Sequence, residues 1–213
     1  MANVFVTGAG GFMGSRLCAE LLRRGHTVSG LVRPGSEAKL PPGCRAVTGD
    51  ALDASTWRQQ LAGCDALVHL VGVAHPSPAK AAQFRSVDLA GARAALSAAV
   101  DARVSHFVYV SVAHPAPVMR EYIAARSEAE DSIRASGIRA TILRPWYVLG
   151  PGRWWPLMLA PAYWLLEALP ATRDSARRLG LVRWPQMIAA LAGAVERPPQ
   201  GVRILEVPEI RTA

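Results

Sequence analysis

The chain of 213 residues contains only three cysteines, which stand far apart at positions 18, 44 and 64. An odd and widely spaced set does not form a disulfide framework and does not match the ligand spacing of a structural zinc site. No basic segment precedes the first apolar run, so we expect no secretory leader. These absences together predict a protein of a reducing compartment, the cytoplasm.

Long apolar runs and basic runs are also missing. The most apolar stretch, residues 154–166, is too short and too interrupted by proline to cross a bilayer. The formal net charge is +8, but most arginines stand singly and none of the basic positions alternates with aromatics, so we expect no nucleic-acid partner. The surplus positive charge suits an anionic, phosphate-bearing ligand. No metal-ligand cluster is apparent, so no metal site is predicted.

The sequence instead alternates short apolar runs with helical patterns. The predicted strands cover residues 3–7, 27–33, 44–50, 65–72, 106–111 and 139–145, and an alanine-rich helix covers about 82–102. The interiors of these strands are apolar almost throughout, which is typical of strands buried on both faces. We therefore predict an α/β fold of the Rossmann type, a doubly wound parallel sheet with helices on both faces.

The composition of the chain changes after Pro145. We predict two units, a sheet domain at 1–150 and a short C-terminal cap at 151–213 that packs against it. The apolar run 201–208 either returns one strand to the sheet or forms a small second layer. Five of the six tryptophans follow residue 145, and they either line an apolar pocket or fill the core or a dimer face of the cap.

A glycine-rich loop stands between the first strand and the first helix. Gly8, Gly11 and Gly14 are spaced three apart, which allows a tight turn and lets backbone approach a pyrophosphate without Cβ clashes. The helix that follows offers unpaired N–H groups and the positive end of its dipole to an anion. Because the loop sits at the start of a βαβ series, the pattern predicts a dinucleotide site.

Five segments in this order resemble one family. They are TGAGGFMG (7–14), GDALD (49–53), HLVG (69–72), VDLAGARAALSAA (87–99) and ILRPWYVLGPG (142–152). The sequence resembles the short-chain dehydrogenase/reductase superfamily, in its extended and atypical branch with NmrA-like and epimerase-like members. The resemblance covers residues 3–150 well and the tail more loosely. It implies an NAD(P) cofactor.

The resemblance also implies which residues hold that cofactor. Asp50 would meet the adenine amino group, and Ala51 would offer its backbone. The remaining implied contacts are the glycine loop with Phe12 and Met13, the ribose turn Leu70, Val71 and Gly72, the nicotinamide stretch Pro145, Trp146 and Val148, and the helical pair Tyr122 and Arg126.

Arg33 ends the second predicted strand and bears on the choice of cofactor. An acidic residue there would bind the ribose hydroxyls of NAD, whereas a guanidinium pairs with the 2′-phosphate of NADP in a forked geometry. Arg33 therefore favours NADP, with NAD as the alternative. In the opposing interpretation, Arg33 points into water or stacks on adenine in either cofactor.

The catalytic group implied by the family is a serine, a tyrosine and a lysine. Ser111 ends the fifth strand, Tyr122 follows, and Arg126 occupies the lysine position. Tyr122 would exchange the substrate proton, Ser111 would orient the substrate oxygen, and the cation would assist a phenol whose ordinary pKa is about 10. Arginine keeps the charge but cannot relay a proton.

Helical spacing gives an independent argument for this pair. Tyr122 and Arg126 are four residues apart, so they share the face that continues through Ala129 and Ile133. An inward arginine needs a polar or anionic partner. The cofactor is one candidate, and Asp88, which replaces the asparagine of the family helix, is another. In the alternative interpretation, which involves no catalysis, Tyr122 packs in the core and Arg126 extends to solvent.

The sequence predicts an NADP(H)-dependent oxidoreductase that reduces a small, apolar, carbonyl-like or quinone-like substrate. His114, Trp154 and Trp155 are the candidates for contact with that substrate. Two alternatives stay open, a non-catalytic NmrA-like redox sensor and, third, a sugar-nucleotide epimerase or dehydratase. The oligomeric state is left open.

Overall fold

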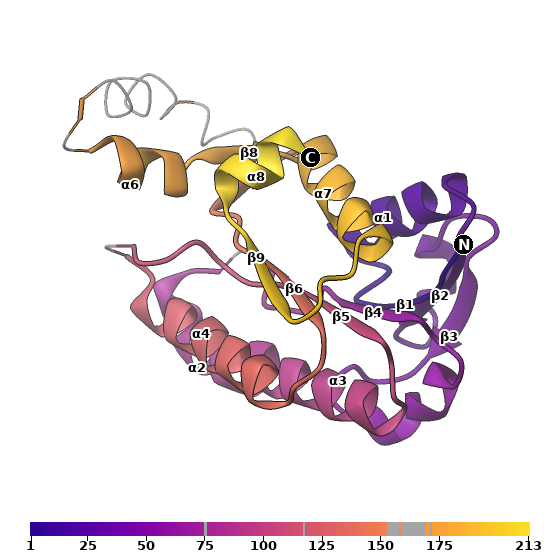
Figure 1. Ribbon diagram of the computed structural model, residues 1–213. Coiled ribbons are helices and arrows are strands. Elements are labelled where there is room, and N and C mark those ends of the chain that lie inside the picture. Colours follow the sequence, from indigo (N-terminus) through magenta and orange to yellow (C-terminus); the bar gives the residue numbers. More distant parts are fainter. Residues whose placement is uncertain (75, 117, 153–157, 159–168, 171) are drawn as a thin grey trace.

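The computed structural model describes residues 1–74, 76–116, 118–152, 158, 169–170 and 172–213. Its centre is a seven-stranded sheet in the order β3-β2-β1-β4-β5-β6-β9, and every neighbouring pair of strands is parallel (Figure 1). The strand order reverses between β1 and β4, which is the topological switch point of a Rossmann-type fold. The predicted fold class is confirmed.

Each predicted apolar run forms a strand, though most strands are shorter than the runs. Their bounds are β1 Asn3–Thr7, β2 Thr27–Val32, β3 Arg45–Thr48, β4 Ala66–His69, β5 His106–Val110 and β6 Ala140–Leu143. In β1, Val4 and Val6 pack on one side of the sheet and Phe5 on the other, because successive side chains alternate between the faces. Burial on both faces explains the continuous apolar runs.

Helices cover the two faces of the sheet. Figure 1 shows α1 (Phe12–Arg23) and α7 (Trp184–Glu196) on one face, and α3 (Ala90–Asp101) and α4 (Arg120–Ala135) on the other. The predicted alanine-rich helix is a continuous helical stretch formed by α2 (Ala81–Gln83), η5 (Phe84–Leu89) and α3. Its middle segment, η5, is π-helical, a widened turn that is frequent at functional sites. The sequence pattern did not indicate this turn.

The C-terminal part of the chain completes the sheet. The predicted run 201–208 supplies β9 (Val202–Leu205), which pairs with β6, and then α8 (Val207–Thr212). Between β6 and β9 in the chain, β7 (Tyr147–Leu149) pairs with β8 (Leu181–Arg183), and α6 (Arg173–Arg178) precedes β8. Helix α7 packs on α1 and joins the core of the first 150 residues. Trp154 and Trp155 lie outside the described residues.

Among the described residues, no helix combines the length and the apolar character that a membrane crossing requires. The same residues hold no group of three or more side chains placed to bind a metal ion.

Two histidines are buried in the sheet without charge. His69 Nδ1 lies 2.9 Å from Thr7 Oγ1, and His106 Nε2 lies 3.0 Å from Thr141 Oγ1. Burial, together with the charge of Arg126, lowers the pKa of His69 to about 3. Burial and two nearby arginines lower the pKa of His106 to about 4.

These histidines make stability depend on pH in a defined window. Above about pH 6.5 the folded and the unfolded chain both hold neutral histidines, so the contribution is complete. Below it only the unfolded chain gains protons, and we expect the free energy of unfolding to fall by about 1.4 kcal/mol per pH unit for each histidine. Urea unfolding at pH 7.5 and 5.0 measures this, because carboxylates such as Glu20, whose folded pKa lies at about 2, lose their contribution mainly below their unfolded pKa of about 4.3. The double variant His69→Gln/His106→Gln should have a shallower slope, and an unchanged slope would exclude the two histidines as its cause.

Candidate active site

The glycine loop lies at the carboxyl end of β1, beside the switch point between β1 and β4. Gly8 follows β1 with φ +71°, a backbone conformation that glycine adopts without strain, and its carbonyl accepts from the Gly11 N–H at 3.0 Å. Helix α1 then begins at Phe12, next to the turn that follows β4. A Cβ on Gly8 would lie 3.1 Å from the Leu70 carbonyl, so the loop and the β4 turn touch through backbone.

Gly14 is the glycine that the packing requires most strictly. A Cβ there would lie 2.7 Å from Ala9 Cα and would also collide with the Gly8 carbonyl oxygen. Both obstacles are backbone, so no side-chain rotation relieves them. The absence of a Cβ therefore lets α1 start directly against the loop, with its N-terminal N–H groups turned to the crevice. This cradle fits a pyrophosphate.

The residues predicted for the adenosine end stand at the ends of the neighbouring strands. Arg33 is exposed directly after β2. Asp50 follows β3 by two residues, and its carboxylate accepts from the Leu52 N–H at 2.9 Å, which forms a local turn. Ala51 is half-buried beside it. The parallel sheet brings all three to the same edge as the glycine loop, since each follows the carboxyl end of a strand.

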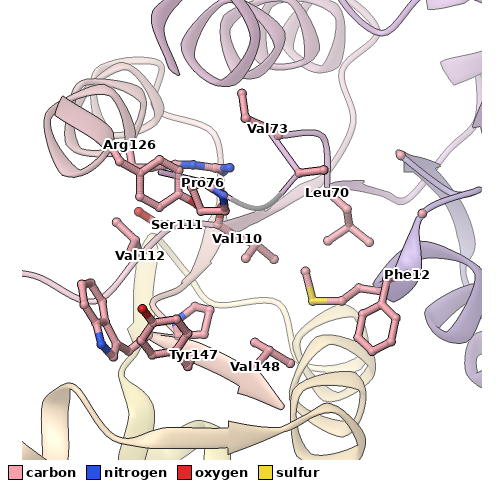
Figure 2. Close-up of a pocket in the computed structure, with 18 of the residues that line it drawn as sticks. Phe12, Leu70, Val73, Pro76, Val110, Ser111, Val112, Arg126, Tyr147 and Val148 are labelled. Carbon is pink, nitrogen blue, oxygen red and sulfur yellow. Dashed lines mark hydrogen bonds between the residues drawn. The ribbon is translucent and has the colours of Figure 1, made fainter. Parts of the chain in front are cut away.

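A cavity of about 440 Å³ opens at this edge and is bounded by the glycine loop. Figure 2 shows Phe12 on one side of it, Arg126 and Ser111 on the opposite side, and Tyr147 and Val148 below. The predicted cofactor residues that line it are Gly8, Gly11, Phe12, Met13, Gly14, Leu70, Gly72, Tyr122, Arg126, Pro145, Trp146 and Val148. The sequence did not indicate the other residues that complete the wall, namely Val73, Ala74, Pro76, Val110, Val112, Met119 and Tyr147.

Tyr122 lies on the first turn of α4. Its ring packs against Phe84 of η5, with the ring centroids 5.0 Å apart and the planes inclined by 59°. The residue is half-buried and borders the cavity. Helix α4 buries Ala129 and Ile133, as the helical spacing predicted, so Tyr122 and Arg126 lie on its inward side.

Arg126 is buried, and its guanidinium is held by the protein itself. Its Nη2 pairs with Asp88 Oδ1 at 2.5 Å, and its Nη1 donates to the Val110 carbonyl at 2.7 Å. Burial alone would lower the pKa of Arg126, but Tyr109, Tyr122 and Asp88 around it raise that pKa above its ordinary value. The arginine therefore stays charged and does not extend to solvent.

The pairing of Arg126 with Asp88 depends on the turn after β4. Asp88 is fully buried in the π-helical segment, and its second carboxylate oxygen accepts from the Val73 N–H at 3.1 Å. A Cβ on Gly72 would lie 2.9 Å from Asp88 Oδ1 and would also strike Arg126 Nη2. Asp88, one of the two partners that the sequence offered for Arg126, is therefore in contact with it.

The hydroxyl of Ser111 is engaged away from the cavity. Ser111 borders the cavity at 3% exposure, and its Oγ donates to Glu130 Oε1 at 2.6 Å. The next residue, Val112, presents an apolar side chain to the same cavity. His114 turns toward the same carboxylate, with Nε2 3.5 Å from Glu130 Oε1. The roles of Ser111 and His114 stay predictions.

Glu130 is the polar residue that the sequence argument overlooked. It stands four residues after Arg126 and eight after Tyr122, so the helical repeat that identified the pair continues to it. Glu130 is fully buried, and Arg144 grips its carboxylate through two nitrogens, at 2.5 and 3.0 Å. The four-residue spacing was the available signal.

Replacing Gly14 by alanine tests the cradle. We expect Gly14→Ala to weaken binding of either nicotinamide dinucleotide by about tenfold or more, because its Cβ meets backbone and forces the loop off the start of α1. Fluorescence titration of NADH and NADPH measures this. Gly201→Ala is the matched control, since a Cβ at Gly201 meets nothing within 4 Å. Equal affinities in the two variants would contradict the cradle.

Two curated relatives are reductases. Over 170 residues, 70% of this chain, it is 29% identical to the 4-hydroxy-2-methyl-3-oxo-4-farnesyl-3,4-dihydroquinoline-1-oxide ketoreductase of Stigmatella aurantiaca. Over 210 residues, 98% of this chain, it is 28% identical to the ceramide reductase of Caulobacter vibrioides. The chain spans 51% and 65% of the length of these two relatives.

Solved structures share the fold of this chain, and a family model covers the residues of the cavity. The enzyme WbmH of Bordetella bronchiseptica, in complex with NAD+, matches with a TM-score of 0.71 at 22% identity, over 97% of this chain and 75% of that one. MoeE5 in complex with UDP-glucuronic acid and NAD matches with a TM-score of 0.73 at 21% identity, over 96% and 76%. The NAD(P)H-binding family model matches residues 8–151, from the glycine loop past the nicotinamide stretch. This chain therefore belongs to the NAD(P)H-binding family, as its resemblance to the short-chain dehydrogenase/reductase superfamily predicted.

Proposed function

We propose that this chain is an NADP(H)-dependent reductase of a small, apolar carbonyl or quinone. One observation carries the proposal: a phenol and a fixed cation, Tyr122 and Arg126, border the same cavity as the glycine cradle. Because both stand on one face of α4, the rigid helix sets their separation. A buried cation beside a half-buried phenol at a cofactor crevice is the arrangement that proton donation to a reduced carbonyl needs.

The cradle fits a nicotinamide dinucleotide, because the bare Gly14 lets α1 begin directly against the loop, where its N-terminal N–H groups can meet a pyrophosphate. When bound, the reduced cofactor supplies a hydride. Pro145, Trp146 and Val148 border the cavity across from the loop and would confine the nicotinamide end. Arg126 keeps donors beyond those engaged by Asp88 and Val110, and these would face the cofactor ribose.

Tyr122 would deliver the proton. A carbonyl that accepts a hydride develops negative charge on oxygen, and a phenol at the cavity wall can neutralise it by donating its proton. Arg126 cannot supply that proton, because its pKa is raised. It would instead contribute a fixed field, reduced by the adjacent Asp88 carboxylate at 2.5 Å. We therefore expect slow rather than fast turnover.

The lining supports an apolar substrate. Val73, Pro76, Val112 and Met119 face the cavity, with Tyr147 beyond them. Side chains of this kind bury flat or aliphatic carbon surface and offer few hydrogen bonds. The names of the two reductases above describe a farnesylated quinoline oxide and a ceramide, which are also apolar.

Arg33 would select NADPH over NADH by pairing with the 2′-phosphate at the adenosine end of the cofactor. We expect Arg33→Ala to weaken NADPH by about tenfold or more and to leave NADH nearly unchanged, because a forked guanidinium–phosphate contact contributes about 1.5–3 kcal/mol. Titration of both cofactors by fluorescence quenching measures the gap. Arg139→Ala, which removes the same charge just before β6 at the opposite edge of the sheet, is the control. Equal affinity of the unaltered protein for both cofactors would refute the preference.

Tyr122→Phe tests the reductase itself. We expect turnover of NADPH with a carbonyl or quinone substrate to fall by about 100-fold or more, since a general acid contributes about 10²–10⁴ to the rate. NADPH affinity should change by less than about twofold. Tyr109→Phe is the matched control, because the Tyr109 hydroxyl lies 3.4 Å from Arg126 Nη1 but that residue does not line the cavity.

The same experiment separates the second candidate, a non-catalytic dinucleotide sensor. What favours the sensor is that the protein already engages two of the three polar groups: Arg126 pairs with Asp88, and Ser111 donates to Glu130. A sensor needs the cradle but not the phenol. Unchanged turnover in Tyr122→Phe would make α4 a binding wall and would favour the sensor. The third hypothesis, sugar-nucleotide chemistry, rests on likeness of fold alone.

A further inference from the structure

Glu130 lies behind the cavity wall, one helical turn beyond Arg126. Its carboxylate is fully buried yet accepts four hydrogen bonds from three residues, and His114 Nε2 lies 3.5 Å from Oε1. Ser111 Oγ lies 2.6 Å from Oε1, Arg144 Nε lies 3.0 Å from Oε1, and the Nη2 nitrogens of Arg144 and Arg134 lie 2.5 and 2.9 Å from Oε2. Arg144 is itself fixed from the other side by Glu206, 2.9 Å away.

These neighbours settle the protonation of Glu130. Burial alone would raise its pKa, but hydrogen bonds from Arg144, Ser111 and Arg134 outweigh burial and lower the pKa below its ordinary value. Two guanidinium groups contact one carboxylate, so the cluster needs the anion for its charge balance. Glu130 therefore holds no proton at neutral pH, and every hydrogen bond it makes is one that it accepts.

The direction of the Ser111 hydroxyl follows from that. A serine hydroxyl has one proton and two lone pairs, and Ser111 gives its proton to Glu130. What remains for the cavity, which Ser111 borders, are lone pairs. Toward a ligand, Ser111 can then accept a hydrogen bond but cannot donate one. A carbonyl oxygen has no proton to offer, whereas an alcohol has one.

We infer that Glu130 is a positioning residue that commits Ser111 to the role of acceptor, so that the site binds the alcohol member of a carbonyl–alcohol pair through Ser111 and the carbonyl member without it. The inference rests on the proposed function for the class of ligand. It assigns to Tyr122 alone the donation of a proton to the carbonyl, and to Ser111 the recognition of the hydroxyl that this donation forms. The O–H bond forms on the former carbonyl oxygen, and its hydrogen then points to Ser111.

A matched ligand pair tests this direction. Acetophenone is titrated into the NADP⁺-loaded protein and 1-phenylethanol into the NADPH-loaded protein, so that neither mixture reacts, and ligand-observed NMR gives each dissociation constant. We expect Ser111→Ala to weaken the alcohol about fivefold, since one neutral hydrogen bond is lost. The ketone should change by less than about twofold.

Glu130→Gln should change the affinities for the two ligands in opposite directions. The amide nitrogen would take the Oε1 place, because the Oε2 place faces two guanidinium nitrogens and the Oε1 place faces one, Arg144 Nε. From the Oε1 place it donates to Ser111 Oγ. That frees the serine proton for the cavity, so the ketone should tighten and the alcohol weaken, each by about threefold to fivefold. Glu206→Gln is the matched control, because it alters the same arginine, Arg144, without touching Ser111. A merely structural role for Glu130 would weaken both ligands together, and that result would overturn the inference.

A second measurement needs no ligand. In a Ser111→Cys variant the substituted thiol stands beside the Glu130 carboxylate, which disfavours the thiolate and slows alkylation by iodoacetamide. Adding Glu130→Gln should speed alkylation of that peptide, followed by mass spectrometry, by about tenfold, and adding Glu206→Gln should not. Equal alkylation rates with and without Glu130→Gln would contradict the contact between position 111 and Glu130. If the rates differ as expected while neither probe binds, the contact at Ser111 stands and the proposed carbonyl reductase fails.

Discussion

The buried ion pair between Arg126 and Asp88 is the constraint on which the cavity depends. A guanidinium enclosed by protein needs an anion, and removing one partner of such a pair typically costs about 3–5 kcal/mol. Here the pair joins α4 to the π-helical turn, while the other contacts of the two side chains reach the turn after β4 at Val73 and the end of β5 at Val110. Four segments of the chain are thus held at one point, and three of them, all but the π-helical turn, line the cavity.

The same helix carries a second buried charge one turn further on. Tyr122, Arg126 and Glu130 follow one another at four-residue steps, so α4 presents a phenol, a cation and an anion along a single stripe. Both charges are neutralised from other elements, Arg126 by Asp88 and Glu130 chiefly by Arg144. The phenol is therefore the group of this stripe that is left to face a ligand, and it borders the cavity between Phe84 and the cation.

The C-terminal segment belongs to the same core and is not separate from it. Strand β9 closes the sheet beside β6, and α7 lies against α1, whose first turn forms the anion cradle. Arg144 and Glu206 link the end of β6 to the end of β9 at 2.9 Å, so the ion cluster behind Ser111 uses residues from both parts of the chain. The chain spans only part of the length of its reductase relatives, and the NAD(P)H-binding family model covers residues 8–151, which include the residues that line the cavity.

The sequence by itself determined the sheet, the cradle and the tyrosine–arginine pair, because these depend on local patterns: apolar runs, glycines three apart and a four-residue helical repeat. It also offered Asp88 as a partner for Arg126 without deciding between it and the cofactor. Only the tertiary structure shows the contact with Asp88, because that contact depends on a π-helical turn and on a bare Gly72, which no periodicity reveals. Glu130 follows Arg126 at the same four-residue spacing, but only the ends of β5 and β6 bring its partners Ser111 and Arg144 against it. Whether a hydroxyl donates or accepts is decided by its neighbours in space, and those neighbours come from segments that are not adjacent in the chain.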